Sequence, residues 1–271
     1  AVALRDSPDG RGMPVLGFGT CCRPSASGPR LVKSLLAYLR NGGRLIDTAF
    51  MYKNHRDVAA AVRASGVSLA DVWITSKILP KQMGYDAAAA AVDLALQELG
   101  VPYINLMLIH VPDGGKDKRV GAWKALIEAK AAGKVRNIGV SNFDQAQILE
   151  LQAATGTLPA NNQIEFSPYS VPAVKDFVAW MLAQGISVTA YGSLGHSGGS
   201  RRGLEGSGTE ALQRRHGKSA AQILLRWALE KGAALCPGAT SEEHIKENMD
   251  ILGFKLDRDE ISDMEKGTYP A

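Results

Sequence analysis

Short apolar runs alternate with segments of helical periodicity along the whole chain of 271 residues. One such segment, 219–232, ends in Lys and then Gly, which is a normal helix stop. Strands that alternate with helices indicate a parallel sheet, and eight such units indicate that the sheet closes into a barrel. We count eight apolar runs, at 14–20, 44–49, 72–78, 104–110, 135–142, 161–166, 186–194 and 233–239.

The sequence therefore predicts an α/β protein, a (β/α)₈ TIM barrel of parallel strands, with residues 1–271 as a single domain. Residues 1–13 contain a Ser-Pro-Asp-Gly turn signal, which predicts a short N-terminal hairpin capping the barrel bottom. The Gly- and Ser-rich residues 195–208 are expected to form a loop after the seventh strand, on the active-site face. An open doubly wound sheet is the alternative, disfavoured because no Gly-x-Gly-x-x-Gly follows the first strand.

Composition argues against several kinds of partner. The 31 basic residues are scattered among 27 acidic ones, so no nucleic acid partner is predicted. No stretch approaches the length of a membrane span and no signal-peptide pattern is present, so no membrane partner is predicted either. The spacing of Cys21, Cys22 and Cys236 fits neither a zinc site nor a redox pair. We expect no metal, small apolar roles for Cys21 and Cys22, and a reducing cytoplasm.

Four side chains able to move or steer protons lie at or just past the ends of three apolar runs. Lys77 and His110 close VWITSK and INLMLIH, while Asp47 closes RLIDTA and is followed by Tyr52. In a (β/α)₈ barrel the chemistry takes place at the carboxyl ends of the strands. The placement of these four residues therefore predicts an enzyme.

These residue types suit the reduction of a carbonyl group, which needs a hydride donor and an acid for the developing alkoxide. A free tyrosine is a poor acid, but the charge of Lys77 should lower the pKa of Tyr52. Asp47 would keep a buried Lys77 charged, and His110 would orient the carbonyl oxygen or relay a proton. A Schiff-base role for Lys77, as in an aldolase-type barrel, is the alternative.

A series of motifs carries a family resemblance. In chain order they are LGFGT (16–20), LIDTAFMYKN (45–54), ITSK (74–77), LIHVP (108–112), GVSNF (139–143), NQIEFSPY (162–169), TAY (189–191) and PGATSEEHIKEN (237–248). In these motifs the chain resembles the aldo-keto reductases over nearly its whole length. The resemblance implies hydride transfer from a nicotinamide cofactor to an aldehyde or ketone. It places the family's catalytic residues on Asp47, Tyr52, Lys77 and His110, with Tyr52 as the general acid.

The same resemblance implies how the nicotinamide is held. Ser141, Asn142 and Gln163 match residues that hydrogen-bond its carboxamide. Tyr191 matches the aromatic residue that stacks on its ring.

The rest of the cofactor is placed in the same way. Thr20 and Asp47 match contacts to the nicotinamide ribose, and Gly192 and Leu194 lie in the segment whose backbone meets the pyrophosphate. The adenosine half is expected to contact Thr240, Ser241, His244, Glu247 and Asn248.

The chain departs from the family pattern at the 2′-phosphate. Many members have Pro-Lys-Ser after the eighth strand and an Arg in the next helix, whereas this chain has Pro237-Gly238-Ala239 and His244. A fixed cation and a guanidinium fork are both missing. We therefore predict NADPH as the cofactor, with a weakened preference over NADH and NAD use possible.

The substrate pocket departs as well. Where aromatic side chains are common in the family, this chain has Cys21, Leu79 and Val111, and Met51 is a further candidate for the pocket wall. Small side chains and short loops predict an open pocket for a small-molecule carbonyl, with modest discrimination between substrates. The protein is expected to act as a monomer.

Two other functions stay open from sequence. One is a sugar or polyol dehydrogenase that works in the oxidative direction. The other is a non-catalytic, cofactor-binding regulatory subunit on the same fold, although such a subunit has no need of all four catalytic residues.

Overall fold

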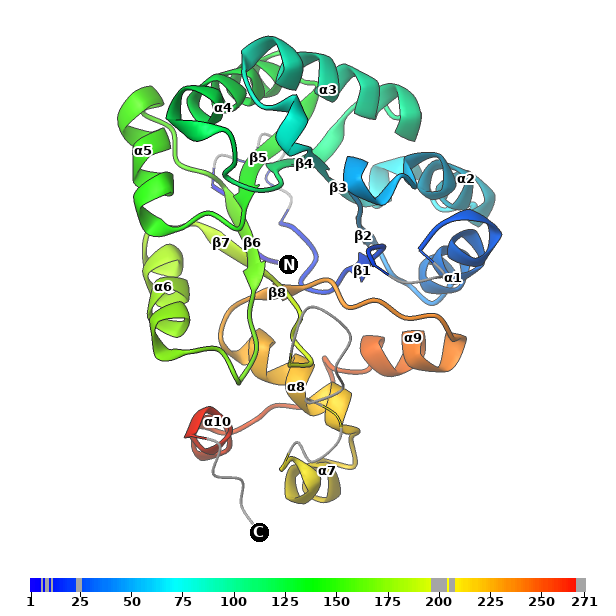
Figure 1. Ribbon diagram of the computed structural model, residues 1–271. Helices are drawn as coiled ribbons and strands as arrows, with labels where there is room; N and C mark the ends of the chain where they lie inside the picture. The colour runs from blue at the N-terminus through cyan, green and yellow to red at the C-terminus, as the bar shows by residue number, and fades with distance from the viewer. Residues whose placement is uncertain are drawn as a thin grey trace.

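The strands of the computed structural model form one parallel sheet in the order β1 to β8 (Figure 1). The structure describes residues 1–5, 7, 10, 12–22, 26–195, 204 and 208–266. All eight strands fall within the predicted apolar runs, so the predicted strand order is confirmed. The strands are β1 (Phe18–Gly19), β2 (Leu45–Asp47), β3 (Trp73–Ile78), β4 (Ile104–Ile109), β5 (Val135–Ser141), β6 (Asn161–Glu165), β7 (Ser187–Tyr191) and β8 (Ala234–Leu235).

Two glycines allow the first strand to meet the last. The amide of Gly17 donates to the oxygen of Leu235 at 2.7 Å, and that of Gly19 donates to Pro237 at 3.0 Å. A Cβ atom at Gly19 would lie 2.3 Å from the carbonyl oxygen of Cys236, so no larger residue fits there. The Gly-x-Gly of the first run therefore brings β1 close enough to β8 to close the barrel, as predicted.

Helices surround the strands on the outside (Figure 1). Three short 3₁₀ helices, η1 (Phe50–Tyr52), η2 (Leu69–Asp71) and η3 (Pro80–Gln82), lie in the connections around β2 and β3. The α-helices are α1 (Gly28–Arg40), α2 (His55–Ser65), α3 (Tyr85–Leu99), α4 (Gly115–Ala131), α5 (Gln145–Thr155), α6 (Pro172–Ala183), α7 (Glu210–His216), α8 (Ala220–Glu230), α9 (Glu242–Met249) and α10 (Arg258–Lys266).

The N-terminal segment folds back on itself and covers the bottom of the barrel. Val2 and Met13 form an antiparallel bridge, and the amide of Gly10 donates to Ser7 at 3.2 Å, as the turn signal predicts. Leu4 and Met13 pack with residues near the start of several strands, among them Trp73. The predicted hairpin cap is thus confirmed. Most of the Gly- and Ser-rich loop predicted after β7 lies outside the described residues.

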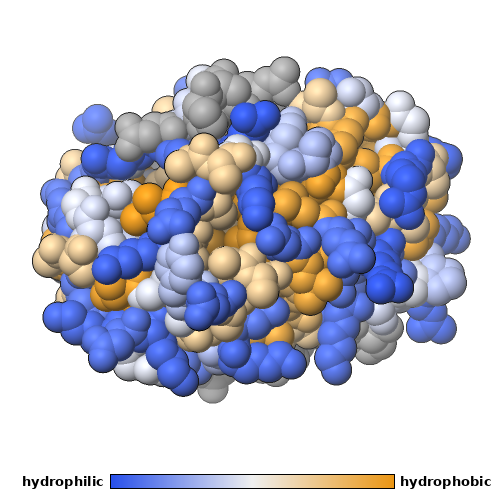
Figure 2. Space-filling view, turned by 90° about the horizontal axis from the view of Figure 1, so that it is seen from above, coloured by the Kyte–Doolittle hydropathy of each residue, from blue (hydrophilic) through white to orange (hydrophobic). Residues whose placement is uncertain are grey.

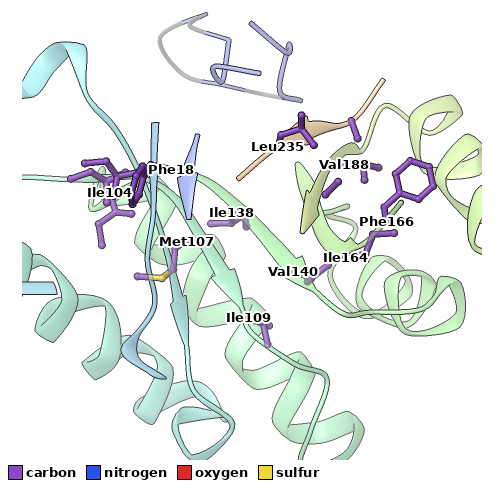
Figure 3. Packing of buried hydrophobic residues seen from close by; sticks show 14 of the residues in the cluster. Phe18, Ile104, Met107, Ile109, Ile138, Val140, Ile164, Phe166, Val188 and Leu235 are labelled. Atoms are coloured by element: carbon purple, nitrogen blue, oxygen red, sulfur yellow. The ribbon is translucent and has the colours of Figure 1, made fainter. Parts of the chain in front are cut away.

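The main core lies between the sheet and the helices. Side chains such as Met107, Ile138 and Phe166 point outward from the strands and are fully or almost fully buried (Figure 3). On the face shown in Figure 2, hydrophilic residues cover much of the surface. No helix among the described residues is long and apolar enough to cross a membrane.

Candidate active site

A cavity of about 410 Å³ opens at the carboxyl ends of the strands. Its wall includes Asp47, Tyr52 and His110. Asp47 is the last residue of β2, Tyr52 ends η1, and His110 directly follows β4. The parallel topology therefore brings residues from separate parts of the chain to one place, as expected for this fold.

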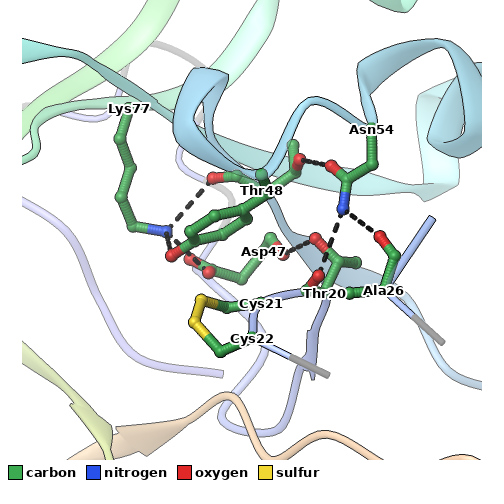
Figure 4. The surroundings of a disulfide bond; sticks show 9 residues. Thr20, Cys21, Cys22, Ala26, Asp47, Thr48, Asn54 and Lys77 are labelled. Atoms are coloured by element: carbon green, nitrogen blue, oxygen red, sulfur yellow. Dashed lines mark hydrogen bonds and ion pairs between the residues drawn. A yellow bond between two sulfur atoms is a disulfide. The ribbon is translucent and has the colours of Figure 1, made fainter. Parts of the chain in front are cut away.

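Lys77 is the centre of the polar network beneath this cavity. Its Nζ atom donates to Asp47 Oδ1 at 2.6 Å, to the carbonyl oxygen of Thr48 at 3.1 Å and to Tyr52 Oη at 3.3 Å (Figure 4). The second carboxylate oxygen of Asp47 accepts a hydrogen bond from Gln163 Nε2 at 2.8 Å. An ammonium has three donors, so Lys77 is fully satisfied although it is completely buried.

The charge on Lys77 is stabilised in this setting. Burial alone would lower the pKa of Lys77, but the attraction of Asp47 and then of Tyr52 outweighs it, and the net shift is upward. Lys77 therefore stays a cation against Asp47, as the sequence predicted.

The pKa of Tyr52 does not follow the sequence prediction. Burial raises it, and the opposing attraction of Lys77 is the smaller effect, so the net shift is upward from 10.0. The expectation of a lowered pKa is thus wrong for this structure, because it counted the charge of Lys77 and left out the loss of solvent. Tyr52 is a protonated phenol at neutral pH, and Lys77 is placed to stabilise the phenolate that would form when the proton leaves.

His110 is a neutral imidazole at the cavity wall. Burial first, and then repulsion by Lys77, lowers the pKa of His110 to about 4. Its ring packs edge-on against that of Tyr52, with centroids 5.8 Å apart. Its Nδ1 atom is buried and has no hydrogen-bond partner within the described part of the chain.

The wall across the cavity from Tyr52 carries amide and hydroxyl groups from β5 to β7. Asn142 adopts a left-handed backbone (φ 62°) and donates from Nδ2 to the oxygen of His110 at 3.0 Å. Tyr191 donates its hydroxyl to Asn142 Oδ1 at 2.7 Å, and Ser141 donates to the carbonyl of Gln163 at 2.9 Å. All four residues predicted to hold the nicotinamide therefore line this one cavity.

Comparison with known proteins identifies the family. The model of the aldo/keto reductase family matches residues 16–267. The chain belongs to the aldo/keto reductase family. It is therefore an oxidoreductase that reduces carbonyl groups with a nicotinamide cofactor.

Its relatives within the family cover almost the whole chain. Morphine 6-dehydrogenase of Pseudomonas putida is 34% identical over 94% of this chain and 87% of its own length. Glyoxal reductase of Bacillus subtilis is 34% identical over 93% and 88%. A crystal structure of an aldo/keto reductase from Brucella melitensis superposes with a TM-score of 0.88 at 33% identity, covering 98% of this chain and 99% of the other. That of a Bombyx mori aldo-keto reductase in complex with NADP gives 0.87 at 27% identity, covering 100% and 94%.

The cleft of this aldo/keto reductase continues past the cavity along β7 and β8. A second hollow of about 190 Å³ is lined by Gly192, Leu194 and Gly238 among others, and it shares Gly192 and Gly238 with the first. Gly192 has a left-handed backbone (φ 65°). The two residues predicted to meet the pyrophosphate thus lie beside each other in one continuous groove.

The segment expected to hold the adenosine half is more exposed. Ser241 is the N-cap of α9. Its hydroxyl accepts from the amide of His244 at 3.1 Å, and the side chain of His244 faces solvent. Glu247 and Asn248 follow on the same helix and are half-buried. Thr240 and Ser241 line a hollow of about 590 Å³.

Two cations that sequence reasoning missed lie on the far side of this hollow. Arg30 and Lys33 of α1 line it together with Thr240, Ser241 and Glu242. They are distant from the family motifs in sequence, and only the contact between α1 and α9 brings them here.

The substrate side differs in part from the prediction. Cys21 and Met51 line the cavity, and Met51 is 50% exposed at its rim. Leu79 and Val111 are half-buried but are not part of this cavity wall. Leu79 instead directly precedes η3, and its amide donates to Gln82 Oε1 at 2.7 Å. Of the four predicted pocket residues, only those from the segments after β1 and β2 therefore line the described cavity.

The prediction for Cys21 and Cys22 needs a correction. Their spacing appeared to fit no redox pair, but the structure records a disulfide bond between these adjacent residues (Figure 4). Both line the cavity. Counting cysteine spacings overlooked this because adjacent cysteines match none of the usual motifs.

Thr20 has a structural contact rather than an open face on the cavity. It is buried, and its hydroxyl donates to the carbonyl oxygen of Asp47 at 2.9 Å. Asn54 Nδ2 donates to the oxygen of Thr20 at 3.1 Å, and Asn54 Oδ1 accepts from the hydroxyl of Thr48 at 2.6 Å. Thr20 thus joins the segment after β1 to the one that carries Asp47.

A buried histidine connects the segments that carry Tyr52 and Lys77. His55 Nε2 lies 2.9 Å from Ser76 Oγ, and its Nδ1 lies 2.8 Å from Glu98 Oε2. The ring of Phe50, in η1 with Tyr52, packs edge-on against His55. Ser76 precedes Lys77 in β3, so His55 fixes η1 against that strand. Neither Ser76 nor His55 is among the residues that line the cavity.

Proposed function

We propose that this chain is an NADPH-dependent reductase of aldehydes or ketones, in which Tyr52 is the general acid. The observation that carries the proposal is the buried Lys77, bonded at once to Asp47 and to Tyr52 Oη. A phenol that touches a permanent cation is placed to give up its proton to a developing alkoxide. NADPH, when bound, supplies the hydride.

The residues of the cleft fit such a cofactor. Ser141, Asn142 and Gln163 present hydroxyl and amide groups at one wall of the cavity, and the ring of Tyr191 lines the same space. The groove then continues past Gly192 and Gly238, which line both hollows and would let the backbone approach an extended ligand closely. The Bombyx mori neighbour was solved in complex with NADP, which supports the same class of cofactor here.

Each catalytic side chain has one role in the proposal. His110 donates to the carbonyl oxygen of the substrate from Nε2, because its buried Nδ1 has no acceptor for a proton among the described residues. Tyr52 then transfers its proton to that oxygen as negative charge develops. Lys77 stabilises the resulting phenolate, and Asp47 keeps Lys77 in position. None of these steps calls for a metal.

The substrate class follows from the cavity. Its wall combines Met51, Cys21 and the Tyr52 ring with few charges, which suits an apolar or aromatic carbonyl. The names of the relatives, morphine 6-dehydrogenase and glyoxal reductase, span large and small substrates. We propose an enzyme that accepts both, with modest selectivity between them.

The test is the oxidation of NADPH and of NADH with a panel of aldehydes, ketones and keto-sugars. Steady turnover with an aromatic aldehyde, preferring NADPH, is expected. Cofactor binding without turnover would instead indicate a regulatory subunit. Turnover confined to the oxidation of polyols would indicate a dehydrogenase.

We also propose that residues 1–271 act as one domain and as a monomer in the cytoplasm. Light scattering at micromolar concentration tests the monomer, and a larger mass that persists on dilution would contradict it.

A further inference from the structure

All three cysteines of the chain meet at the same cavity. Cys21 and Cys22 come from the segment after β1, and Cys236 comes from the segment after β8. The cavity they line is the one that holds Tyr52 and His110. None of the three cysteines takes part in the proton transfer proposed above.

Described residues before and after the pair, Thr20 and Ala26, are bonded to the segment that carries Asp47 and Asn54. The amide and the hydroxyl of Thr20 both donate to the carbonyl oxygen of Asp47, at 3.0 and 2.9 Å. Asn54 Nδ2 donates to the oxygen of Thr20 at 3.1 Å and to that of Ala26 at 2.8 Å (Figure 4). Oxidation or reduction of Cys21 and Cys22 would therefore change the wall of the cavity that holds Tyr52.

The two cysteines differ in access. Cys22 is exposed and has a left-handed backbone (φ 67°), whereas Cys21 is half-buried against the cavity. A molecule arriving from solvent thus meets Cys22 first. Cys21 then lies next to it, and the structure records their sulfur atoms bonded to each other.

Cys236 is a different kind of thiol. Its Sγ atom donates to the carbonyl oxygen of Ala190 at 3.7 Å, and burial raises its pKa, so it stays protonated. The thiolate is the reactive form of cysteine, so Cys236 is the unreactive member of the three.

We propose that Cys21 and Cys22 form a thiol–disulfide exchange site in the wall of the catalytic cavity, which takes a low-molecular-weight disulfide as its substrate. The Cys22 thiolate attacks one sulfur of that disulfide, whose S–S bond breaks and releases one small thiolate. The Cys21 thiolate then attacks Cys22 Sγ and releases the second. Two electrons pass to the small disulfide, and the two thiol protons leave on the two small thiols.

The exchange changes the shape that the substrate meets. In the reduced pair each side chain can rotate on its own, and in the disulfide both are tied to one position in the wall. A fixed wall discriminates against a bulky substrate more than against a small one. This consequence rests on the proposed carbonyl reductase function, whereas the exchange chemistry does not.

The exchange is tested by first reducing the whole protein with dithiothreitol, removing the reductant, then incubating it with oxidised glutathione and measuring its intact mass. Wild type is expected to lose two hydrogen atoms, and peptide mapping should locate the bond at Cys21–Cys22. Cys21→Ser is expected to retain one glutathione on Cys22, because no second thiol can release it. Cys22→Ser should react on the order of 10-fold more slowly, because Cys21 is less accessible.

The consequence is tested by kinetics of the reduced and oxidised protein with a bulky aromatic aldehyde and a small one. Oxidation is expected to lower kcat/KM on the order of 10-fold for the bulky substrate and less than about twofold for the small one. Dithiothreitol should reverse the loss. In Cys21→Ala/Cys22→Ala the oxidant should change neither value.

The two proposals fail in distinguishable ways. Tyr52→Phe should form the same disulfide although it turns over slowly, so a missing reductase activity leaves the mass result intact. A wild-type protein that loses no hydrogen atoms, or that only accumulates bound glutathione, would overturn the exchange site. So would a kinetic response to oxidant that persists in the double alanine variant.

Discussion

The cavity around Lys77 and the segment around His244 are both parts of the proposed cofactor site, but they are built differently. Lys77 is completely buried, and its three donors go to Asp47, Thr48 and Tyr52. His244 has its side chain in solvent at the start of a short helix. One region is fixed by its own contacts, and the other presents free groups on the surface.

The difference reflects what each region has to do. Proton transfer needs groups held within hydrogen-bond reach before the substrate arrives, and low exposure strengthens their electrostatic coupling. Recognition of a phosphate needs only donors and charge at a surface, and exposed charges contribute little individually. We therefore expect substitutions in the cavity to change rates by orders of magnitude, and substitutions near His244 to change only affinity.

The largest expected effect is that of Tyr52→Phe. Removing the phenol removes the proposed proton donor, and we predict a loss of turnover on the order of 100-fold or more. Affinity for NADPH should be unchanged, because the groups on β5 to β7 are untouched. Single-turnover kinetics measure the loss, and fluorescence titration with NADPH is the control. Near-normal chemistry in this variant would assign the acid to another group.

The next effect concerns the pair behind the acid. Lys77→Met should reduce turnover nearly as much as Tyr52→Phe, and Asp47→Asn somewhat less, because Lys77 keeps its contact with Thr48. Members of one network do not act independently, so the double variant should lose less than the product of the two single losses. Each single change also breaks a buried ion pair, which destabilises by about 3–5 kcal/mol.

That cost calls for a control. Urea unfolding of each variant separates instability from lost chemistry, and kinetics belong at a temperature where every variant is folded. Losses that multiply in the folded double variant would show that Asp47 and Lys77 do not act through one another.

The effect of pH on the rate of carbonyl reduction should be smaller than the effects of these substitutions, and it should appear outside the neutral range. Burial raises the pKa of Tyr52 above 10.0 and lowers that of His110 to about 4, so both groups keep their working forms between these values. The rate of carbonyl reduction should be flat near neutrality and fall on the alkaline side as Tyr52 loses its proton. Alcohol oxidation needs the phenolate, so its rate should rise with pH. A reductive rate that fell between about pH 6 and 8 would contradict these assignments.

The sequence could predict those features of the fold and the site that depend on patterns within a short segment of the chain. The apolar runs and their spacing were enough for the barrel, because each βα unit carries its own pattern. Asp47, Tyr52, Lys77 and His110 could be located because each lies at or near a strand end, and the topology brings those ends together.

The sequence failed where the outcome depends on contacts between distant segments. The net pKa of Tyr52 requires its burial, which the spacing of residues does not contain. The contact of His55 with Glu98 joins α2 to α3, and Arg30 reaches the hollow at α9 only through packing. Leu79 and Val111 lie just after strands, as predicted, but neither residue is part of the described cavity wall.

The smallest expected effect is that of His244→Arg, which tests the exposed segment around His244. A guanidinium grips a phosphate through paired donors at any working pH, whereas an imidazole is charged only when protonated. We predict that NADPH binds about 5-fold more tightly to the variant, the equivalent of about 1 kcal/mol for an exposed contact. NADH binding should not change.

His244→Gln is the neutral control, and its preference for NADPH over NADH should not exceed that of wild type. Dissociation constants of both cofactors are measured for all three proteins. A preference that is unchanged in His244→Arg, but falls in Arg30→Gln or Lys33→Gln, would place the phosphate in the hollow between α1 and α9. The 2′-phosphate would then be recognised by Arg30 and Lys33 of α1, a helix that none of the family motifs includes.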